Sequence, residues 1–238
     1  MKLDILAFGA HPDDVELSCS GVIVKHIKLG KKVGVVDLTQ GELGTRGSAE
    51  LRMKEAAKAA KVMGVLVRDN LKMADSFFLN DKTHQLEIIK KIRQYQPEII
   101  LCNAVTDRHP DHGRAAQLVS EACFYSGLIK IDTKQNGKPQ KAWRPKVVYH
   151  YIQDRYIKPD LLVDVTPFVE KKMEAIKTFA SQFYNPHSAE PDSPISSKDF
   201  LDFIKNRMTV FGREIGVPYA EGFTVERSIG VDDLFHLI

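Results

Sequence analysis

Two short turns in this chain concentrate side chains suited to metal or acid–base chemistry. The first turn, residues 9–14, reads Gly-Ala-His-Pro-Asp-Asp, and the second, residues 107–112, reads Asp-Arg-His-Pro-Asp-His. Together they contain three histidines and four aspartates. Each turn follows a short apolar run, which places each polar cluster just beyond an expected buried strand. Imidazole and carboxylate groups in this setting point to a metal-binding or hydrolytic site.

Imidazole nitrogens and carboxylate oxygens together suit zinc, and a catalytic zinc ion usually has three protein ligands and one position left for water. His11 and Asp14 lie three residues apart around a proline turn and can reach one ion. His112 can supply a third ligand from the second turn. The spacing by itself does not distinguish Asp13 from Asp14 as the ligand. The remaining carboxylate beside the metal is a natural general base.

His109 and Asp111 complete the second turn. A histidine beside the metal can stabilise developing oxyanion charge in its imidazolium form. Asp111 is expected to orient one of the histidines, as carboxylates around ligand imidazoles do. The structural alternative is helix capping, because Asp13 or Asp14 can cap a following helix. Capping does not call for a histidine beside each turn, so the paired signal favours a site.

The elements around the two turns alternate between strand and helix patterns. Strands are predicted at residues 3–8, 32–38, 65–71 and 98–102, and helices at residues 15–29, 48–63, 86–95 and 115–126. Strands alternating with helices of this length form parallel βαβ units, and ligands bind outside the carboxyl ends of such strands. We therefore expect an α/β fold with a Rossmann-like, open, mostly parallel sheet and helices on both faces. Both polar turns then lie on the functional edge of that sheet.

The C-terminal third elaborates this fold. After a mostly polar loop, the patterns predict two strands and two helices, at residues 146–152, 161–165, 169–179 and 200–213. No internal repeat and no low-complexity tract is present. Residues 1–238 are therefore predicted to form a single domain.

Composition and charge exclude several classes of function. The 238-residue chain is 43% hydrophobic and 27% charged, with a formal net charge of +3, which argues against a dedicated nucleic-acid binder. No window approaches the ~20 apolar residues that span a bilayer, and no signal-peptide pattern is present. Cys19, Cys102 and Cys123 lie in apolar segments, as buried thiols in a reducing compartment do. We expect a cytoplasmic protein with neither nucleic-acid nor membrane partners.

The two turns, and the order of elements between them, resemble the LmbE-like, or PIG-L, family of zinc-dependent de-N-acetylases. Residues 41–47, Gly-Glu-Leu-Gly-Thr-Arg-Gly, and the helix start that contains Arg52 fit the same family. Residues 219–223, Tyr-Ala-Glu-Gly-Phe, are similar to the family's terminal segment. Within the family, the chain is most similar to the bacillithiol-pathway enzymes that deacetylate N-acetylglucosaminyl-malate.

The resemblance implies a role for each residue of the two turns. It implies that one zinc ion per chain is bound by His11, Asp14 and His112. It also implies that Asp13 is the general base and that His109 is the electrostatic or acid partner.

The resemblance further implies that Arg52 holds a substrate carboxylate; a solvated charge at a helix start is the alternative. Some relatives carry a tyrosine, which can polarise the scissile carbonyl, where this chain has Asp107. The oxyanion donor beyond zinc and His109 is therefore not assigned. Tyr184, the remaining aromatic candidate, is expected to be a buried core residue.

The expected activity is zinc-dependent hydrolysis of the N-acetyl group of an N-acetylglucosamine conjugate, with N-acetylglucosaminyl-malate as the preferred small-molecule substrate. A homo-oligomer is also expected. One alternative is a deacetylase or amidase of the same family that acts on another N-acetyl sugar or on a thiol conjugate. Another is a non-catalytic α/β protein that binds a metal or a nucleotide. Against the latter, the first turn lacks the GxGxxG glycines of a dinucleotide site, and metal binding alone gives no reason for a second carboxylate.

Overall fold

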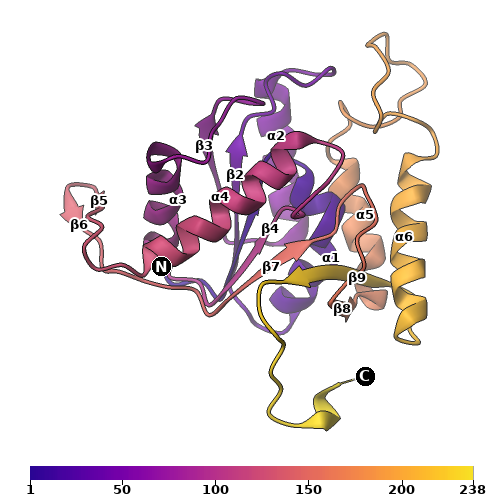
Figure 1. Ribbon diagram of the computed structural model, residues 1–238. Coiled ribbons are helices and arrows are strands. Elements are labelled where there is room, and N and C mark those ends of the chain that lie inside the picture. The colour runs from indigo at the N-terminus through magenta and orange to yellow at the C-terminus, as the bar shows by residue number, and fades with distance from the viewer. Residues whose placement is uncertain (238) are drawn as a thin grey trace.

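The computed structural model describes residues 1–237, and its centre is a seven-stranded sheet (Figure 1). The strand order is β3-β2-β1-β4-β7-β9-β8. The strands are β1 (Ile5–Gly9), β2 (Val33–Thr39), β3 (Val67–Met73), β4 (Ile99–Cys102), β7 (Val147–Tyr151), β8 (Leu161–Asp164) and β9 (Ala220–Val225). Strands β1, β2, β3, β4 and β7 pair in parallel, whereas β9 pairs antiparallel with both β7 and β8. The expected Rossmann-like, mostly parallel α/β sheet is confirmed.

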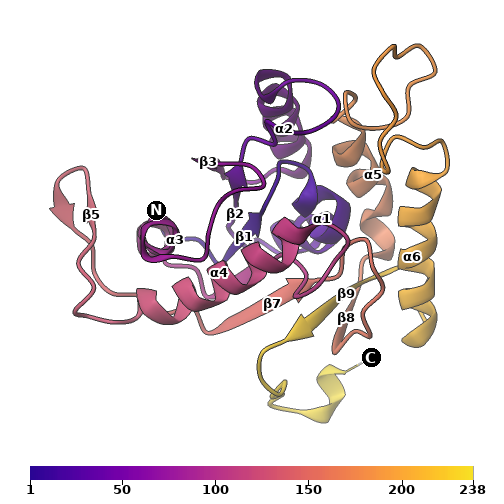
Figure 2. The same cartoon turned by 45° about the horizontal axis from the view of Figure 1, so that its top comes forward.

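Helices cover both faces of the sheet, as expected (Figures 1 and 2). The helices are α1 (Asp14–Lys28), α2 (Ala49–Met63), α3 (Lys82–Tyr95), α4 (Pro110–Ser126), α5 (Val169–Lys177) and α6 (Phe200–Glu214), with short 3₁₀ turns η1 (Thr166–Phe168) and η2 (Leu234–His236). Buried side chains of α1, α2, α5 and α6 form one core, and those of α3 and α4 form the other. Alternation within β1 explains this division, because Ile5 and Ala7 enter the first core whereas Leu6 and Phe8 enter the second.

Local chemistry sets the helix boundaries near the active edge. At the start of α2, the hydroxyl of Ser48 accepts a hydrogen bond from the Leu51 amide, which satisfies one of the free donors there. At its end, Gly64 adopts a left-handed conformation with φ of 80°, which glycine reaches without a side-chain clash. These two residues fix where α2 begins and ends, and the first of them therefore fixes where Arg52, on the first turn, is placed.

The C-terminal third contains one strand that periodicity missed. Strand β9 contains most of the Tyr-Ala-Glu-Gly-Phe segment and inserts between β7 and β8. The polar loop before β7 also carries a small hairpin, β5 (Lys134–Gln135) with β6 (Lys138–Pro139), which projects from the sheet (Figure 1). The other predicted strands and helices of this third are confirmed as β7, β8, α5 and α6. The assignment of residues 1–238 to a single domain stays a prediction.

Two further expectations concern thiols and membranes. Cys19, Cys102 and Cys123 are free and buried, as expected from their apolar surroundings. None of the helices within residues 1–237 combines the length and the apolar character that crossing a membrane requires.

Candidate active site

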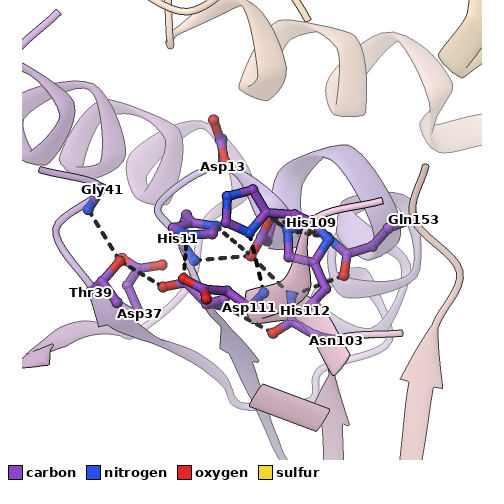
Figure 3. A network of polar contacts seen from close by, with 12 residues as sticks. His11, Asp13, Asp37, Thr39, Gly41, Asn103, His109, Asp111, His112 and Gln153 are labelled. Atoms are coloured by element: carbon purple, nitrogen blue, oxygen red, sulfur yellow. Dashed lines mark hydrogen bonds and ion pairs between the residues drawn. The ribbon is translucent and has the colours of Figure 1, made fainter. Parts of the chain in front are cut away.

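The two polar turns meet because their strands are neighbours. Strands β1 and β4 pair in parallel, with Ile5 opposite Ile99 and Ala7 opposite Leu101, so both segments leave the sheet at the same edge. Connections from β1 and β4 then diverge to opposite faces of the sheet, towards α1 and α4. A crevice opens at such a switch point. Figure 3 shows the imidazole rings of His11, His109 and His112 gathered there.

Asp14 lies at the centre of the cluster, and its carboxylate is fully engaged. Its Oδ2 accepts hydrogen bonds from the His11 amide and from Asn103 Nδ2, both at 2.9 Å. Its Oδ1 accepts one from Gln153 Nε2 at 3.1 Å and lies 3.2 Å from His112 Nε2. Burial alone would raise the pKa of Asp14, but the charges of His112 and His11 hold that pKa well below its usual range. Asp14 is therefore a buried carboxylate facing two imidazoles.

Carboxylates behind His11 and His112 fix how the two rings face. His11 Nε2 lies 3.1 Å from Asp75 Oδ1 and 3.3 Å from Asp111 Oδ2, which leaves Nδ1 on the side of Asp14, 3.7 Å from Oδ2. His112 Nδ1 lies 2.6 Å from Asp107 Oδ2, which leaves Nε2 facing Asp14. Burial opposes the charged rings, but these carboxylates raise the pKa of His11 to about 10 and that of His112 to about 9. The expected orienting contact of Asp111 with a histidine is present.

Asp13 points away from this cluster and towards Arg52. Its Oδ2 accepts a hydrogen bond from Arg52 Nη2 at 2.7 Å, and both residues are buried. Asp13 has φ of 120°, a conformation that a residue other than glycine adopts only under strain, and such strain concentrates at functional sites. Burial raises the pKa of Asp13, and the Arg52 charge partly offsets that rise. Since the Asp13 side chain makes no capping hydrogen bond to α1, the capping alternative is wrong for it.

His109 occupies the N-cap of α4, where its Nδ1 accepts a hydrogen bond from the Asp111 amide at 3.2 Å. Because Nδ1 is an acceptor, the proton of the neutral ring sits on Nε2, which is then a hydrogen-bond donor. The His109 and His11 ring centroids are 4.7 Å apart. Burial, together with the charges of His11 and His112, lowers the pKa of His109. Capping and proximity to the other histidines thus coexist in this residue.

A cavity of about 230 Å³ opens over the cluster. Its walls include the polar residues of both turns and side chains contributed by α1, α2 and α6, with the 43–46 and 193–195 segments between them. Arg52 lines this cavity and is only 6% exposed, so the solvated-charge alternative for Arg52 is wrong. Tyr184 does not line the cavity and is 48% exposed; its expected burial in the core is therefore wrong, because the 185–197 connection leaves it at the surface.

The donor set fits a divalent transition metal. His11 Nδ1 and His112 Nε2 are the two ring nitrogens that carboxylates behind the rings leave free, and both face the Asp14 carboxylate. Ligand-capable atoms of His11, His109 and His112 also lie within 4.8 Å of one another, as do those of His11, Asp75 and Asp111. In the latter group the carboxylates contact the His11 nitrogen that faces away from Asp14, as orienting partners of a ligand do. His11, Asp14 and His112 therefore stay the predicted set of ligands for one ion.

Several residues of the site escaped sequence reasoning, and they share one signal. Each follows the carboxyl end of a parallel strand: Asp75 after β3, Asn103 after β4 and Gln153 after β7. Ligands bind outside the carboxyl ends of parallel strands, and this rule applies to every such strand as it does to β1 and β4. Asp107, noted only as a departure from the family pattern, anchors His112 and accepts a hydrogen bond from the Arg155 amide at 2.7 Å.

Comparisons with known proteins indicate a family for this chain. Residues 6–123 match the PIG-L family, described as GlcNAc-PI de-N-acetylase. The chain is 28% identical over 232 residues to diacetylchitobiose deacetylase of Thermococcus kodakarensis, covering 92% of this chain and 81% of that protein. It is 27% identical over 201 residues to a protein of Bacillus anthracis named probable N-acetyl-alpha-D-glucosaminyl L-malate deacetylase 2, covering 75% and 81%. The crystal structure of conserved protein TT1542 from Thermus thermophilus superposes with a TM-score of 0.85 at 28% identity, covering 97% of this chain and 98% of that one.

Proposed function

The chain belongs to the PIG-L, or LmbE-like, family, and from this premise we propose that it is a zinc-dependent N-deacetylase of an N-acetylglucosamine conjugate. The observation that carries the proposal is the division of labour between the two adjacent aspartates. Asp14 faces His11 and His112, whereas Asp13 turns to Arg52 and stays free of the three histidines. A protein that only bound a metal would have no use for the second carboxylate.

The proposed ligands are His11, Asp14 and His112. Zinc at this position would polarise the acetyl carbonyl and lower the pKa of the water that it binds. Asp75, Asp111 and Asp107 hold the two ligand rings in place from behind.

Asp13 is the proposed general base in amide hydrolysis. It takes a proton from the attacking water, whose oxygen bonds to the acetyl carbon, and the carbon–nitrogen bond then breaks to release acetate and the free amine. Burial favours its role, because a raised pKa makes the carboxylate a stronger base. His109 donates a hydrogen bond from Nε2 to the oxyanion, and either Asp13 or His109 returns a proton to the leaving amine.

The proposed substrate is N-acetylglucosaminyl-malate. The similarity to the Bacillus anthracis protein supports an acidic conjugate, and the arginines in the cavity wall supply positive charge. Arg52 is proposed to contact a substrate carboxylate, which would share the guanidinium with Asp13. The similarity to diacetylchitobiose deacetylase favours a neutral disaccharide as the second candidate. The cytoplasmic location and the homo-oligomer expected from the sequence stay predictions.

The proposal is tested with Asp13→Asn, which keeps the size of the side chain but removes the ability to accept a proton. General-base catalysis is worth about 10²–10⁴-fold, so kcat should fall by that factor while bound zinc stays at the wild-type level. Acetate release from N-acetylglucosaminyl-malate and from diacetylchitobiose measures the rate, and metal analysis measures the zinc. Asp132→Asn, the same change at an exposed position, is the matched control.

Other results would contradict particular parts of the proposal. Loss of zinc from Asp13→Asn would make Asp13 a ligand and exchange the roles of the two aspartates. Full activity with zinc retained would refute the mechanism. A wild-type protein that binds zinc but releases no acetate from any N-acetylated glycoside would favour the binding-protein alternative.

A further inference from the structure

Arg207 is set apart from the other arginines of the cavity wall by its lack of an acidic partner. The cavity is lined by Arg46, Arg52, Arg108 and Arg207. The first three each form an ion pair with a carboxylate, in the pairs Arg46–Glu190, Arg52–Asp13 and Arg108–Asp154. Within residues 1–237, no carboxylate oxygen lies within 4.0 Å of an Arg207 nitrogen, the distance that defines an ion pair. Glu221, Asp154 and Asp107 act on the Arg207 charge only from beyond ion-pair distance, so no carboxylate of the described residues is in direct contact with it.

The contacts that Arg207 does make leave most of its donors free. Its Nη2 donates to the Leu17 carbonyl at 3.1 Å, and its guanidinium carbon lies 5.5 Å from the centre of the Phe203 ring. A guanidinium has five N–H donors. Among the described residues, each Arg207 nitrogen is either accessible to solvent or hydrogen-bonded. Burial lowers the pKa of Arg207 to about 10, which leaves the group charged at neutral pH. The remaining donors are therefore available to a ligand in the cavity.

The surroundings of Arg207 suit the carbon skeleton of a conjugate. Side chains from α1, α6 and the 193–195 segment make this part of the wall largely apolar: Leu17, Pro194, Ile195, Phe200, Phe203 and Ile204. Ser18 also lines the wall, and its buried hydroxyl has no hydrogen-bond partner among the described residues. A fixed cation and an unsatisfied hydroxyl within apolar walls select a ligand with an anionic group on a short carbon chain.

We propose that Arg207 binds the anionic group, a carboxylate or a phosphate, on the aglycone of the substrate, and that it sets the preference for acidic conjugates. This inference rests on the proposed N-deacetylase function and extends it. It adds a residue of α6 to the specificity of the site beside Arg52, whose guanidinium is shared with Asp13. The anion completes the ion pair that Arg207 lacks in the protein alone.

A purely structural role is the rival explanation. The Leu17 carbonyl also accepts a hydrogen bond from the buried Lys172 at 3.0 Å, so in this rival role Arg207 is a second support for α1. That role would make loss of Arg207 equally harmful for every ligand. A role in binding the anion would make it harmful only for acidic ones.

The test is binding of the deacetylated product, which requires no acetyl chemistry. Glucosaminyl-malate and its neutral dimethyl ester are titrated calorimetrically into the wild type, Arg207→Gln, Arg207→Lys and Arg213→Gln. Arg213 lies exposed on the same helix and outside the cavity, so its variant controls for loss of a positive charge. Hydrogen bonds to charged groups predict about 10- to 100-fold weaker binding of glucosaminyl-malate to Arg207→Gln, with the ester changed by less than about threefold.

Arg207→Lys keeps the charge and should lose part of the affinity, and it provides the comparison if Arg207→Gln does not fold. Titration of glucosamine 1-phosphate distinguishes phosphate from carboxylate, and arginine-dependent binding of either supports the inference. Equal losses for malate and ester, or no loss for any anion, would overturn it, as would a wild type that does not prefer the anion. Acetate release by the wild type is measured separately. Its failure would refute the deacetylase proposal, whereas the role of Arg207 in binding the anion would still be decided by the titrations.

Discussion

We expect the ion pair between Arg52 and Asp13 to set the pH dependence of the reaction. Arg52 Nη2 donates to Asp13 Oδ2 at 2.7 Å inside the protein. Burial raises the pKa of Asp13, and the neighbouring guanidinium acts in the opposite direction. Arg52→Gln removes the positive charge while keeping a polar side chain. The pKa of Asp13 should therefore rise further in this variant.

The size of the shift follows from the contact. An arginine beside an aspartate lowers the aspartate pKa by about 1–3 units, so its removal should raise that of Asp13 by about the same amount. A general base must be deprotonated to act, so activity is lost as the pH falls through its pKa. The acid limb of the kcat/KM profile should therefore move to higher pH by about 1–3 units, with close to tenfold lower activity per unit at any pH well below the limb.

The assay is acetate release measured from about pH 4 to pH 9, a range chosen to cover the acid limb of the profile. Wild type, Arg52→Gln and Arg52→Lys are compared, and Arg52→Lys should shift the limb less because it keeps the charge. If Arg52 only bound substrate, its loss would raise KM at every pH and leave the limb in place. An unshifted acid limb in Arg52→Gln would refute the coupling of Arg52 to the base.

Three further outcomes are expected. His112→Ala should lose most of the roughly one zinc ion per chain that a three-ligand site holds, and full occupancy by metal analysis would refute the ligand assignment. The pKa of His112 is raised from 6.5 to about 9. In metal-free protein, the protonated ring should therefore stabilise the fold fully below pH ~6.5, and this stabilisation should be lost as the pH rises to ~9. Urea unfolding should show a loss of up to roughly 3 kcal/mol over this range. A free energy of unfolding that rose over this window would contradict it. Glu221→Gln should destabilise the fold by about 3–5 kcal/mol, because it leaves Lys172 buried without its charged partner 2.7 Å away; a change below about 1 kcal/mol would show that the pair contributes little.

Glu221 also lies in residues 219–223, a segment that the sequence singled out only by its resemblance to the family. Glu221, on β9, accepts hydrogen bonds from the backbone amides of Gly21 and Val22 within α1 and pairs with Lys172 of α5. A Cβ at position 21 would lie 2.9 Å from Glu221 Oε1, so a larger residue there would displace this carboxylate. The Tyr-Ala-Glu-Gly-Phe segment therefore holds α1, the helix that begins at Asp14, against the sheet.

The sequence by itself determined the fold class and the position of the two polar turns at one edge of the sheet. Hydrophobic periodicity is local, so strands and helices from β1 to α4 could be predicted within a few residues of their observed bounds. His11, Asp13 and Asp14 are contiguous or nearly so, and the parallel pairing of β1 with β4 follows from the βαβ order that brings His109 and His112 beside them.

Only the tertiary structure decided which atoms meet. The separate directions of Asp13 and Asp14 depend on a φ of 120° and on Arg52, which is 39 residues away in the chain. Strand β9 finds its place between β7 and β8 through pairing with strands far away in the chain, which no local pattern encodes. Arg207 occupies an ordinary polar position in a helical pattern, and it becomes a cavity residue only when α6 packs beside α1. Contacts of this kind depend on how whole elements pack, and side-chain periodicity records only which face of an element is buried.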